Sequence, residues 1–221
     1  MTDHIALQVA AVHAEIAAAC HAAGRDPTTI RLIAVTKSQG PEVLAPLAAA
    51  GIVDLGENRW DHQAVMAAAA VPPQRFHAIG RIQSRQLAKL VPMTAVLHSL
   101  HDPDHVPRLE GVCAGAGRTL DVFVQVNVSG EAAKAGLTPE AVGPMLDRVR
   151  SCAHLHLCGL MTMAPEGAAP DVLHACFGGL ADLGRRHGVT RLSMGMSQDF
   201  PIAIAHGATD LRIGTRLFTP P

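Results

Sequence analysis

The stretch RLIAVTKSQGPEVLAPLAAAGIVDLGENRW (residues 31–60) decides the fold of this chain. It opens with the short β-branched segment RLIAVT (31–36), continues through PEVLAPLAAA (41–50), and returns to an apolar segment, IVDL (52–55). The middle segment suits a helix that begins at a proline, and the outer two suit strands. A strand, a helix and a second strand in this order predict two parallel strands, because parallel neighbours need a crossover connection.

The same alternation continues to the end of the chain. Further strand candidates lie at 75–79, 95–98, 120–127, 156–162, 191–194 and 210–213, with helix candidates at 59–70, 84–90, 104–112, 139–152, 171–187 and 201–206. Eight alternations of strand and helix in 221 residues fit an α/β fold, a single (β/α)₈ TIM barrel that forms one domain over residues 1–221.

An extra helix precedes the first strand. Ile5, Val9, Val12 and Ile16 recur at helical spacing and give this segment one buried stripe, which Gly24 ends. The rival architecture is an open doubly wound sheet. Such a sheet would normally carry a glycine fingerprint after its first strand, where this chain has Lys37.

Composition excludes several classes of function. The chain has 18 Lys and Arg against 19 Asp and Glu, so it offers no basic surface for nucleic acid. It has no tyrosine, which excludes a tyrosine general base. Five cysteines, an odd number, predict reduced thiols and a cytoplasmic location. Polar residues interrupt the first helix, so we expect no membrane span. No exposed apolar helix stands out, so we expect a monomer.

Four residues near the sixth strand suggest a metal site at first sight. Cys152, His154, His156 and Cys158 alternate, and in an extended segment they would share one face. Cys152, however, is expected to end a helix. We therefore predict no bound metal.

Residues at the ends of strands are the candidates for function, because a barrel of this type places its site where strands end and loops begin. Lys37 follows the first strand. A lysine there is most often solvated, but next to an apolar strand it can lose water and become the neutral amine that attacks carbonyl groups.

The last two strands end in small, amide-rich segments. Ser197 follows the seventh strand, and Gly214 and Thr215 follow the eighth. Such residues suit a phosphate cup, although they equally suit ordinary tight turns. The eighth strand of a closed barrel pairs with the first, so one ligand could reach both Lys37 and the cup. A phosphorylated aldehyde fits, and pyridoxal 5′-phosphate (PLP) is the common biological example.

Arg212 lies within the eighth strand and could face the pyridine nitrogen of such a ligand. Its permanent charge would keep that nitrogen unprotonated and weaken the ring as an electron sink. Alternatively, it could pair with a carboxylate such as Asp199 or Asp210.

Several motifs in chain order resemble one known family. They are AVTK (34–37), DLGEN (54–58), FHAIGRIQS (76–84), VQVNVSGEAAKAG (124–136), LSMGMSQD (192–199) and RIGT (212–215). This set is similar to the YggS/PROSC family of pyridoxal phosphate homeostasis proteins.

The resemblance implies a fold type III PLP-binding barrel of the alanine racemase type, without that enzyme's second domain. It implies a role in intracellular vitamin B6 and amino-acid homeostasis, with PLP-dependent enzymes as potential recipients. The positions that match the family's cofactor-binding residues are Lys37 (the Schiff-base lysine), Asn58, His77, Ser197, Arg212, Gly214 and Thr215.

The chain departs from the family around its second and third strands. Arg59 and Trp60 stand where the family usually has tyrosine, and Arg81 stands in place of a histidine. Arg85 and Gln86 replace an Asn-Lys pair. These departures concern the rim of the barrel and any partner it contacts.

We expect a carrier or regulator of PLP without substantial catalysis. Related racemases use a lysine and a tyrosine on opposite faces of the cofactor, and this chain has no tyrosine. An open barrel mouth also screens the charges that would stabilise a transition state. The alternative is a small PLP-dependent racemase or decarboxylase that uses His77, His98 or a cysteine as its second base.

Overall fold

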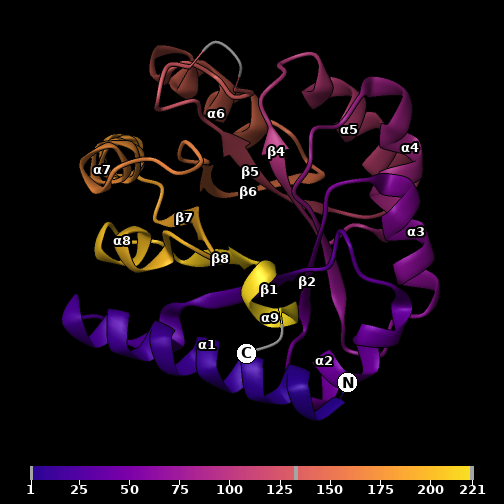
Figure 1. The fold of residues 1–221 in the computed structure, drawn as a ribbon. Helices are drawn as coiled ribbons and strands as arrows, with labels where there is room; N and C mark the ends of the chain where they lie inside the picture. Colours follow the sequence, from indigo (N-terminus) through magenta and orange to yellow (C-terminus); the bar gives the residue numbers. More distant parts are fainter. Residues whose placement is uncertain (1, 132–133, 220–221) are drawn as a thin grey trace.

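The computed structural model describes residues 2–131 and 134–219, so two residues of the 124–136 motif lie outside the described chain. Within them, parallel strands close into a barrel in chain order (Figure 1). The strands are β1 (Arg31–Val35), β2 (Asp54–Glu57), β3 (Arg75–Ala78), β4 (Val96–Leu100), β5 (Leu120–Gln125), β6 (Leu155–Met161), β7 (Arg191–Met196) and β8 (Asp210–Ile213).

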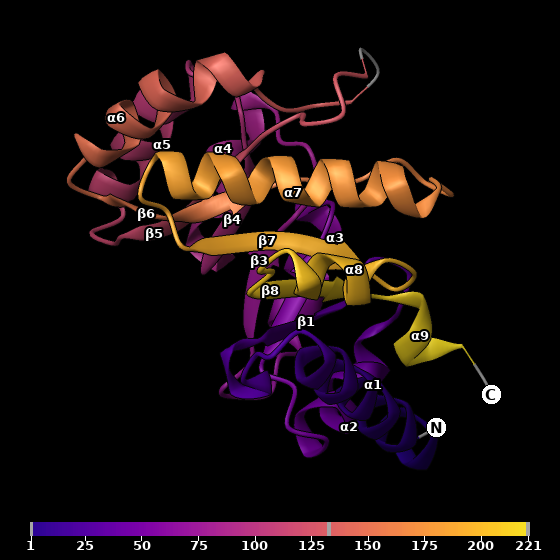
Figure 2. The same ribbon diagram turned by 90° about the vertical axis from the view of Figure 1, so that its left-hand side faces the viewer.

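Helices follow the strands and form the outer layer of the barrel (Figures 1 and 2). They are α1 (Thr2–Ala22), α2 (Leu44–Ala49), α3 (Trp60–Ala68), α4 (Leu87–Leu90), α5 (His105–Gly115), α6 (Val142–Arg150), α7 (Pro170–Arg186), α8 (Phe200–Ala205) and α9 (Thr215–Phe218). Short 3₁₀ turns lead into α2, α4 and α6, and a further one, Pro27–Thr29, precedes β1.

Closure of the barrel confirms the predicted fold and rules out the open sheet. β1 pairs with both β2 and β8, and the first residue of β1, Arg31, lies opposite the first residue of β8, Asp210. An open sheet would leave β1 and β8 unpaired with each other. Strand bounds agree with the sequence prediction to within two residues, and β2 is shifted as a whole, from 52–55 to Asp54–Glu57.

Helix α1 confirms the predicted extra helix and packs along α2, α8 and α9 (Figure 1). Its stripe of Ile5, Val9, Val12 and Ile16 is at most 3% exposed. Residues His4–Ala22 are long and apolar enough to cross a membrane by length and composition alone. The buried stripe explains that composition, because it covers the side of the barrel.

Candidate functional site

The mouth of the barrel lies at the carboxyl ends of the strands, and five of the predicted residues follow those ends. Asn58, Ser197 and Gly214 come directly after β2, β7 and β8. Lys37 is the second residue after β1, and its side chain is exposed. Thr215 begins α9. Parallel strands thus bring residues from both ends of the chain to one rim.

A small polar cup joins the ends of β7 and β8. The Ser197 hydroxyl accepts a hydrogen bond from the Gly214 amide at 3.3 Å and lies 3.1 Å from the Thr215 hydroxyl. The guanidinium of Arg216 donates to the Ser197 carbonyl at 3.4 Å, a contact that the motifs did not predict. Backbone amides, hydroxyls and a nearby guanidinium are the groups that bind phosphate in proteins.

The cup depends on the backbone conformation of Gly195. Its φ of +97° lies in the region that favours glycine, and a Cβ there would stand 2.8 Å from the Ala203 Cβ. The chain between β7 and α8 can turn so tightly only with glycine at this position. Asp199 accepts the Met196 amide at 2.5 Å and holds the same turn.

The cup also touches the end of β1. A Cβ on Gly214 would lie 3.4 Å from both the Cβ and the carbonyl oxygen of Val35. Lys37 follows Val35 by two residues. The loop that carries the lysine and the loop that carries the cup are therefore neighbours.

Arg212 lies inside the barrel beneath this mouth and is only 3% exposed. Its Nη1 donates to the Ser193 hydroxyl at 2.7 Å, and its Nη2 donates to the Thr162 carbonyl at 3.0 Å. Burial lowers the pKa of Arg212 to about 10, against the opposing effect of the Asp199 and Asp210 charges. The group stays cationic at neutral pH. Within the described chain it forms no ion pair with Asp199 or Asp210, the alternative raised by the sequence.

A chain of buried hydrogen bonds leads from Arg212 across the barrel. Ser193 Oγ lies 2.8 Å from His98 Nδ1, and His98 Nε2 lies 2.9 Å from His77 Nδ1. His77 Nε2 then lies 2.8 Å from Asp54 Oδ1. His98 also stacks on the Phe123 ring, with centroids 4.5 Å apart.

The donor and acceptor in each of these hydrogen bonds follow from the two end groups, Asp54 and Arg212. Asp54 can only accept, so His77 donates to it from Nε2 and accepts at Nδ1 from His98. His98 then accepts from the Ser193 hydroxyl, which accepts from Arg212. Burial lowers the pKa of both histidines, that of His98 well below its usual value, which keeps both rings neutral. This series of hydrogen bonds therefore fixes the orientation of the Arg212 guanidinium.

The same contacts locate His77, which the sequence predicts near the cofactor ring. Its side chain is fully buried and both ring nitrogens are occupied, by Asp54 and His98. It reaches Arg212 only through His98 and Ser193. The structure thus separates His77 from the five residues at the mouth.

A second cluster, not predicted from the sequence, holds the loop of Lys37. The buried Glu57 carboxylate accepts from the Thr36 hydroxyl at 2.5 Å and lies 2.7 Å from His62 Nδ1. His62 Nε2 lies 3.0 Å from the Gln39 carbonyl oxygen. His62 therefore bridges the Glu57 carboxylate and the backbone of the loop that carries Lys37. We call Thr36, Gln39, Glu57 and His62 the loop clamp.

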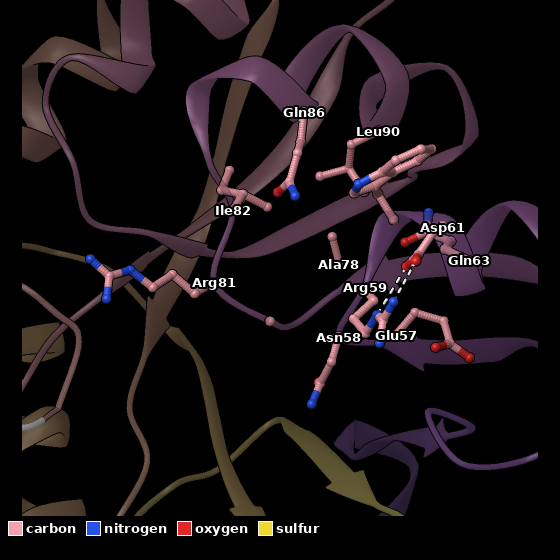
Figure 3. A pocket seen from close by; sticks show the side chains of 12 residues that line it. Glu57, Asn58, Arg59, Asp61, Gln63, Ala78, Arg81, Ile82, Gln86 and Leu90 are labelled. Carbon is pink, nitrogen blue, oxygen red and sulfur yellow. Dashed lines mark hydrogen bonds and ion pairs between the residues drawn. The ribbon is translucent and has the colours of Figure 1, made fainter.

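Asn58 lies beside a cavity of about 140 Å³ between the ends of β2 and β3 (Figure 3). In Figure 3 its side chain points away from the apolar residues that line this cavity. Gly80 approaches its backbone so closely that a Cβ would stand 2.1 Å from the Asn58 carbonyl oxygen. Ser99 donates to the Gly80 carbonyl at 2.6 Å and fixes that approach.

Four of the residues that depart from the family pattern line the same cavity: Arg59, Trp60, Arg81 and Gln86. Arg59 forms a surface ion pair with Asp61, and Arg81 points away from that pair (Figure 3). The side chain of Gln86 caps the backbone of Gln83. These departures form their own local contacts and leave the cup and the loop clamp intact.

Comparisons with known proteins agree with the fold and the site geometry. The sequence profile of the alanine racemase N-terminal domain matches residues 8–220. A pyridoxal phosphate homeostasis protein of Pseudomonas aeruginosa is 38% identical over 217 residues, which cover 97% of this chain and 94% of that protein. A protein of the same name from Deinococcus radiodurans is 36% identical and covers 96% of this chain and 100% of its own length.

One solved relative has a ligand. The structure of PipY from Synechococcus elongatus with PLP bound superposes with a TM-score of 0.84 at 29% identity, over 97% of this chain and 99% of that one. The likeness extends over the whole barrel, so it includes every strand end described above.

Proposed function

The chain belongs to the family of pyridoxal phosphate homeostasis proteins, and we propose that it binds PLP as a Schiff base on Lys37 and carries it without substantial catalysis. The observation that supports this most directly is the pairing of β1 with β8, in which Ala34 lies opposite Ile213. This pairing makes the lysine loop and the polar cup neighbours. A single small ligand with an aldehyde and a phosphate can then use both.

The residues at the mouth fit this cofactor. Ser197, Gly214 and Thr215 offer two hydroxyls and an amide for the phosphate, and Arg216 adds charge beside them. Arg212 has five N–H groups, of which two are used within the described chain. A further donor remains for an unprotonated ring nitrogen. Asn58 at the rim would contact the ring face, and PLP would supply an electrophilic carbonyl group and an electron sink.

Two features favour a carrier over a racemase or decarboxylase. A cationic Arg212 beside the ring nitrogen disfavours the protonated pyridine that withdraws electrons best. The proposed second bases are also occupied, because His77 and His98 are buried and spend both ring nitrogens in the chain to Asp54. Cys158 lies toward the opposite end of the barrel, near Asp121. The names of the relatives likewise describe homeostasis.

We place this role in the cytoplasm, with the chain as a monomer and PLP-dependent enzymes as recipients. The exposed arginines at the rim, Arg59, Arg81 and Arg85, are where a recipient would meet the cofactor. Titration of an apo-enzyme with the loaded protein tests this role. Transfer faster than spontaneous release into buffer supports a direct contact, and transfer at the rate of spontaneous release contradicts it.

The central test is covalent trapping. The purified protein is mixed with PLP, reduced with borohydride and digested, and the modified lysine is found by mass spectrometry. We expect label on Lys37 and a visible absorption band before reduction, both lost in Lys37→Ala. Lys89→Ala is the matched control, since Lys89 lies on α4 against Trp60 and should change neither readout. A colourless wild type without label on Lys37 contradicts the proposal.

Turnover separates the carrier from the alternative enzyme. Wild type loaded with PLP is incubated with a panel of L-amino acids, and D-isomers and released CO₂ are measured. We expect rates that stay near those of free PLP. Robust multiple turnover that Lys37→Ala abolishes would support the racemase or decarboxylase and contradict the carrier.

A further inference from the structure

At the amino end of the barrel, opposite the mouth, three side chains with different ligand atoms meet. His156 Nδ1 lies 3.0 Å from Asp121 Oδ1 and 3.7 Å from Cys158 Sγ. All three ligand atoms lie within 4.8 Å of one another. We propose that Asp121, His156 and Cys158 form a binding site for one borderline-soft divalent cation such as Zn²⁺.

Strand register builds this cluster. Asp121 in β5 and His156 in β6 are direct partners in the sheet, so their side chains share one face. The register shifts between Val122 and Phe123, which inserts Cys158 as an extra residue in β6. This irregularity directs the thiol to the histidine of its own strand. The three ligands therefore come from rigid elements.

The separations suit a tetrahedral ion. Zinc bonds of about 2.0 Å to nitrogen and oxygen and about 2.3 Å to sulfur place neighbouring ligand atoms roughly 3.3 to 3.6 Å apart. The observed 3.0 Å and 3.7 Å differ from that by a few tenths of an ångström. The exposed side chains of Asp121 (40%) and His156 (72%) can rotate to close the site.

A fourth position is open to a large cavity. The cluster lies in the wall of a cavity of about 850 Å³ between the starts of β5, β6 and β7. Three protein ligands and one open position, filled by water, are a common zinc arrangement. Oxygen alone would favour magnesium or calcium, but the sulfur and imidazole donors favour zinc or a neighbouring transition metal.

Nearby positive charges are already compensated. Arg191 lies close to Cys158, but its Nη2 binds Asp210 at 2.6 Å. Arg75, also near Asp121, binds Asp54 at 2.6 Å. The Asp121 carboxylate therefore keeps its charge available for a cation.

Binding must displace a proton. A cation forms the metal–sulfur bond as the S–H bond breaks, and the proton leaves to solvent.

The other two residues of the alternating set serve elsewhere. His154 binds Glu110 at 2.8 Å, and Cys152 donates to the Arg148 carbonyl at the end of α6. The four-residue site considered from the sequence is thus divided. Cys152 still lines the same cavity, which makes it a matched control.

The test uses the full chain without an affinity tag, stripped by a chelator and then dialysed against Zn²⁺ or Co²⁺ alone. We expect one ion per chain and a cobalt spectrum with a thiolate charge-transfer band. Cys158→Ser and His156→Ala should each weaken Zn²⁺ binding at least tenfold, whereas Cys152→Ser should not. Absence of the thiolate band, or wild-type affinity in Cys158→Ser, overturns the site.

Alkylation gives a second readout that does not depend on folded variants. Wild type is treated with iodoacetamide with and without Zn²⁺, and each cysteine is followed by mass spectrometry. Zn²⁺ should slow the labelling of Cys158 at least tenfold and leave that of Cys152 unchanged. Equal protection of both cysteines, or of neither, contradicts the proposal.

Discussion

The two ends of the barrel contain similar kinds of residues in opposite situations. At the amino end, five strands begin with a charged residue, and ion pairs join these residues in one row: Arg75, Asp54, Arg31, Asp210 and Arg191. At the carboxyl end, Lys37, Asn58 and Thr215 are exposed. The amino end satisfies its charges internally, and the mouth leaves its polar groups for a ligand.

We therefore expect the charged residues at the amino end to matter for stability and the polar groups at the mouth to matter for binding. Paired, largely buried charges destabilise a protein when one partner is removed, whereas exposed polar groups can be replaced at little expense to folding. The hydrogen bonds that lead from Arg212 to Asp54 connect the two ends through the barrel interior. The sector of β5 and β6, where Asp121 and His156 face a cavity, is the open part of the amino end.

The largest effect on stability is expected for Asp210→Asn. Asp210 is fully buried and accepts from Arg191 at 2.6 Å, with Arg31 at 3.6 Å. Loss of its charge leaves two arginines without their partner, which should lower the free energy of unfolding by about 3 kcal/mol. Urea denaturation of the apo-protein measures this change.

Asp147→Asn is the matched control, because the Asp147 side chain is 80% exposed and pairs with Arg150 on the surface. We expect a change of about 0.5 kcal/mol or less. Equal effects for the two variants would remove the distinction between the two ends.

As pH falls, protonation of Asp54 should lower the stability of the amino end of the barrel. Burial alone would raise its pKa, but hydrogen bonds from His77 and Arg75 bring it down to about 2, from 3.8. A lowered carboxyl pKa stabilises the fold above about pH 4 and loses that contribution as pH falls toward 2, about 2 kcal/mol in all. Urea midpoints between pH 2 and 6 measure it.

Asp54→Asn should be less stable at pH 6 and should lose this part of the pH dependence. If its stability falls with acid as steeply as that of wild type, another carboxyl group is responsible.

Most of the fold could be predicted from sequence because a parallel barrel repeats one local pattern. Apolar runs such as 31–36 and 120–127 report strands buried on both faces, and proline marks the helix starts. The start of β2 was misplaced because Ile52 and Val53 resemble a strand. Both precede the residue, Asp54, at which pairing with β1 and β3 begins. Pairing is a tertiary property and leaves no local signal.

The site was only partly predictable, for a related reason. Motifs located Lys37, Ser197 and Gly214 because strand ends can be read from the sequence. The loop clamp and the chain through His98 and Ser193 join residues up to 95 positions apart, so only the closed barrel reveals them. His77 near the ring was predicted from the family resemblance, and the sequence does not report how deep its side chain lies in the barrel.

Ser197→Ala tests the phosphate cup at the mouth of the barrel. The Ser197 hydroxyl lies between the Gly214 amide and the Thr215 hydroxyl. Its loss should lower PLP affinity about fivefold, or about 1 kcal/mol. Because Ser197 is only 9% exposed, the free energy of unfolding should also fall by about 1 kcal/mol, which is less than for Asp210→Asn. Equilibrium titration by visible absorption measures the affinity.

Pyridoxal without its phosphate is the control ligand for this variant. Its affinity should be the same for wild type and Ser197→Ala, because the cup contacts only the phosphate. A parallel loss for both ligands would mean that Ser197 acts on the barrel mouth in general.

The smallest expected effect tests whether the loop clamp positions Lys37. His62→Gln removes the imidazole ring that bridges the Glu57 carboxylate and the Gln39 carbonyl. The rate at which PLP becomes covalently bound should fall about threefold, or about 0.6 kcal/mol, with Lys37 still the labelled residue. Stopped-flow absorption measures this rate.

A matched variant distinguishes positioning from a general loss of structure. His13→Gln, on the exposed face of α1, should form the covalent adduct at the wild-type rate. Urea denaturation should show similar stability for His62→Gln and wild type. A covalent rate in His62→Gln equal to that of wild type would mean that the contacts of His62 with Glu57 and the Gln39 carbonyl do not position Lys37.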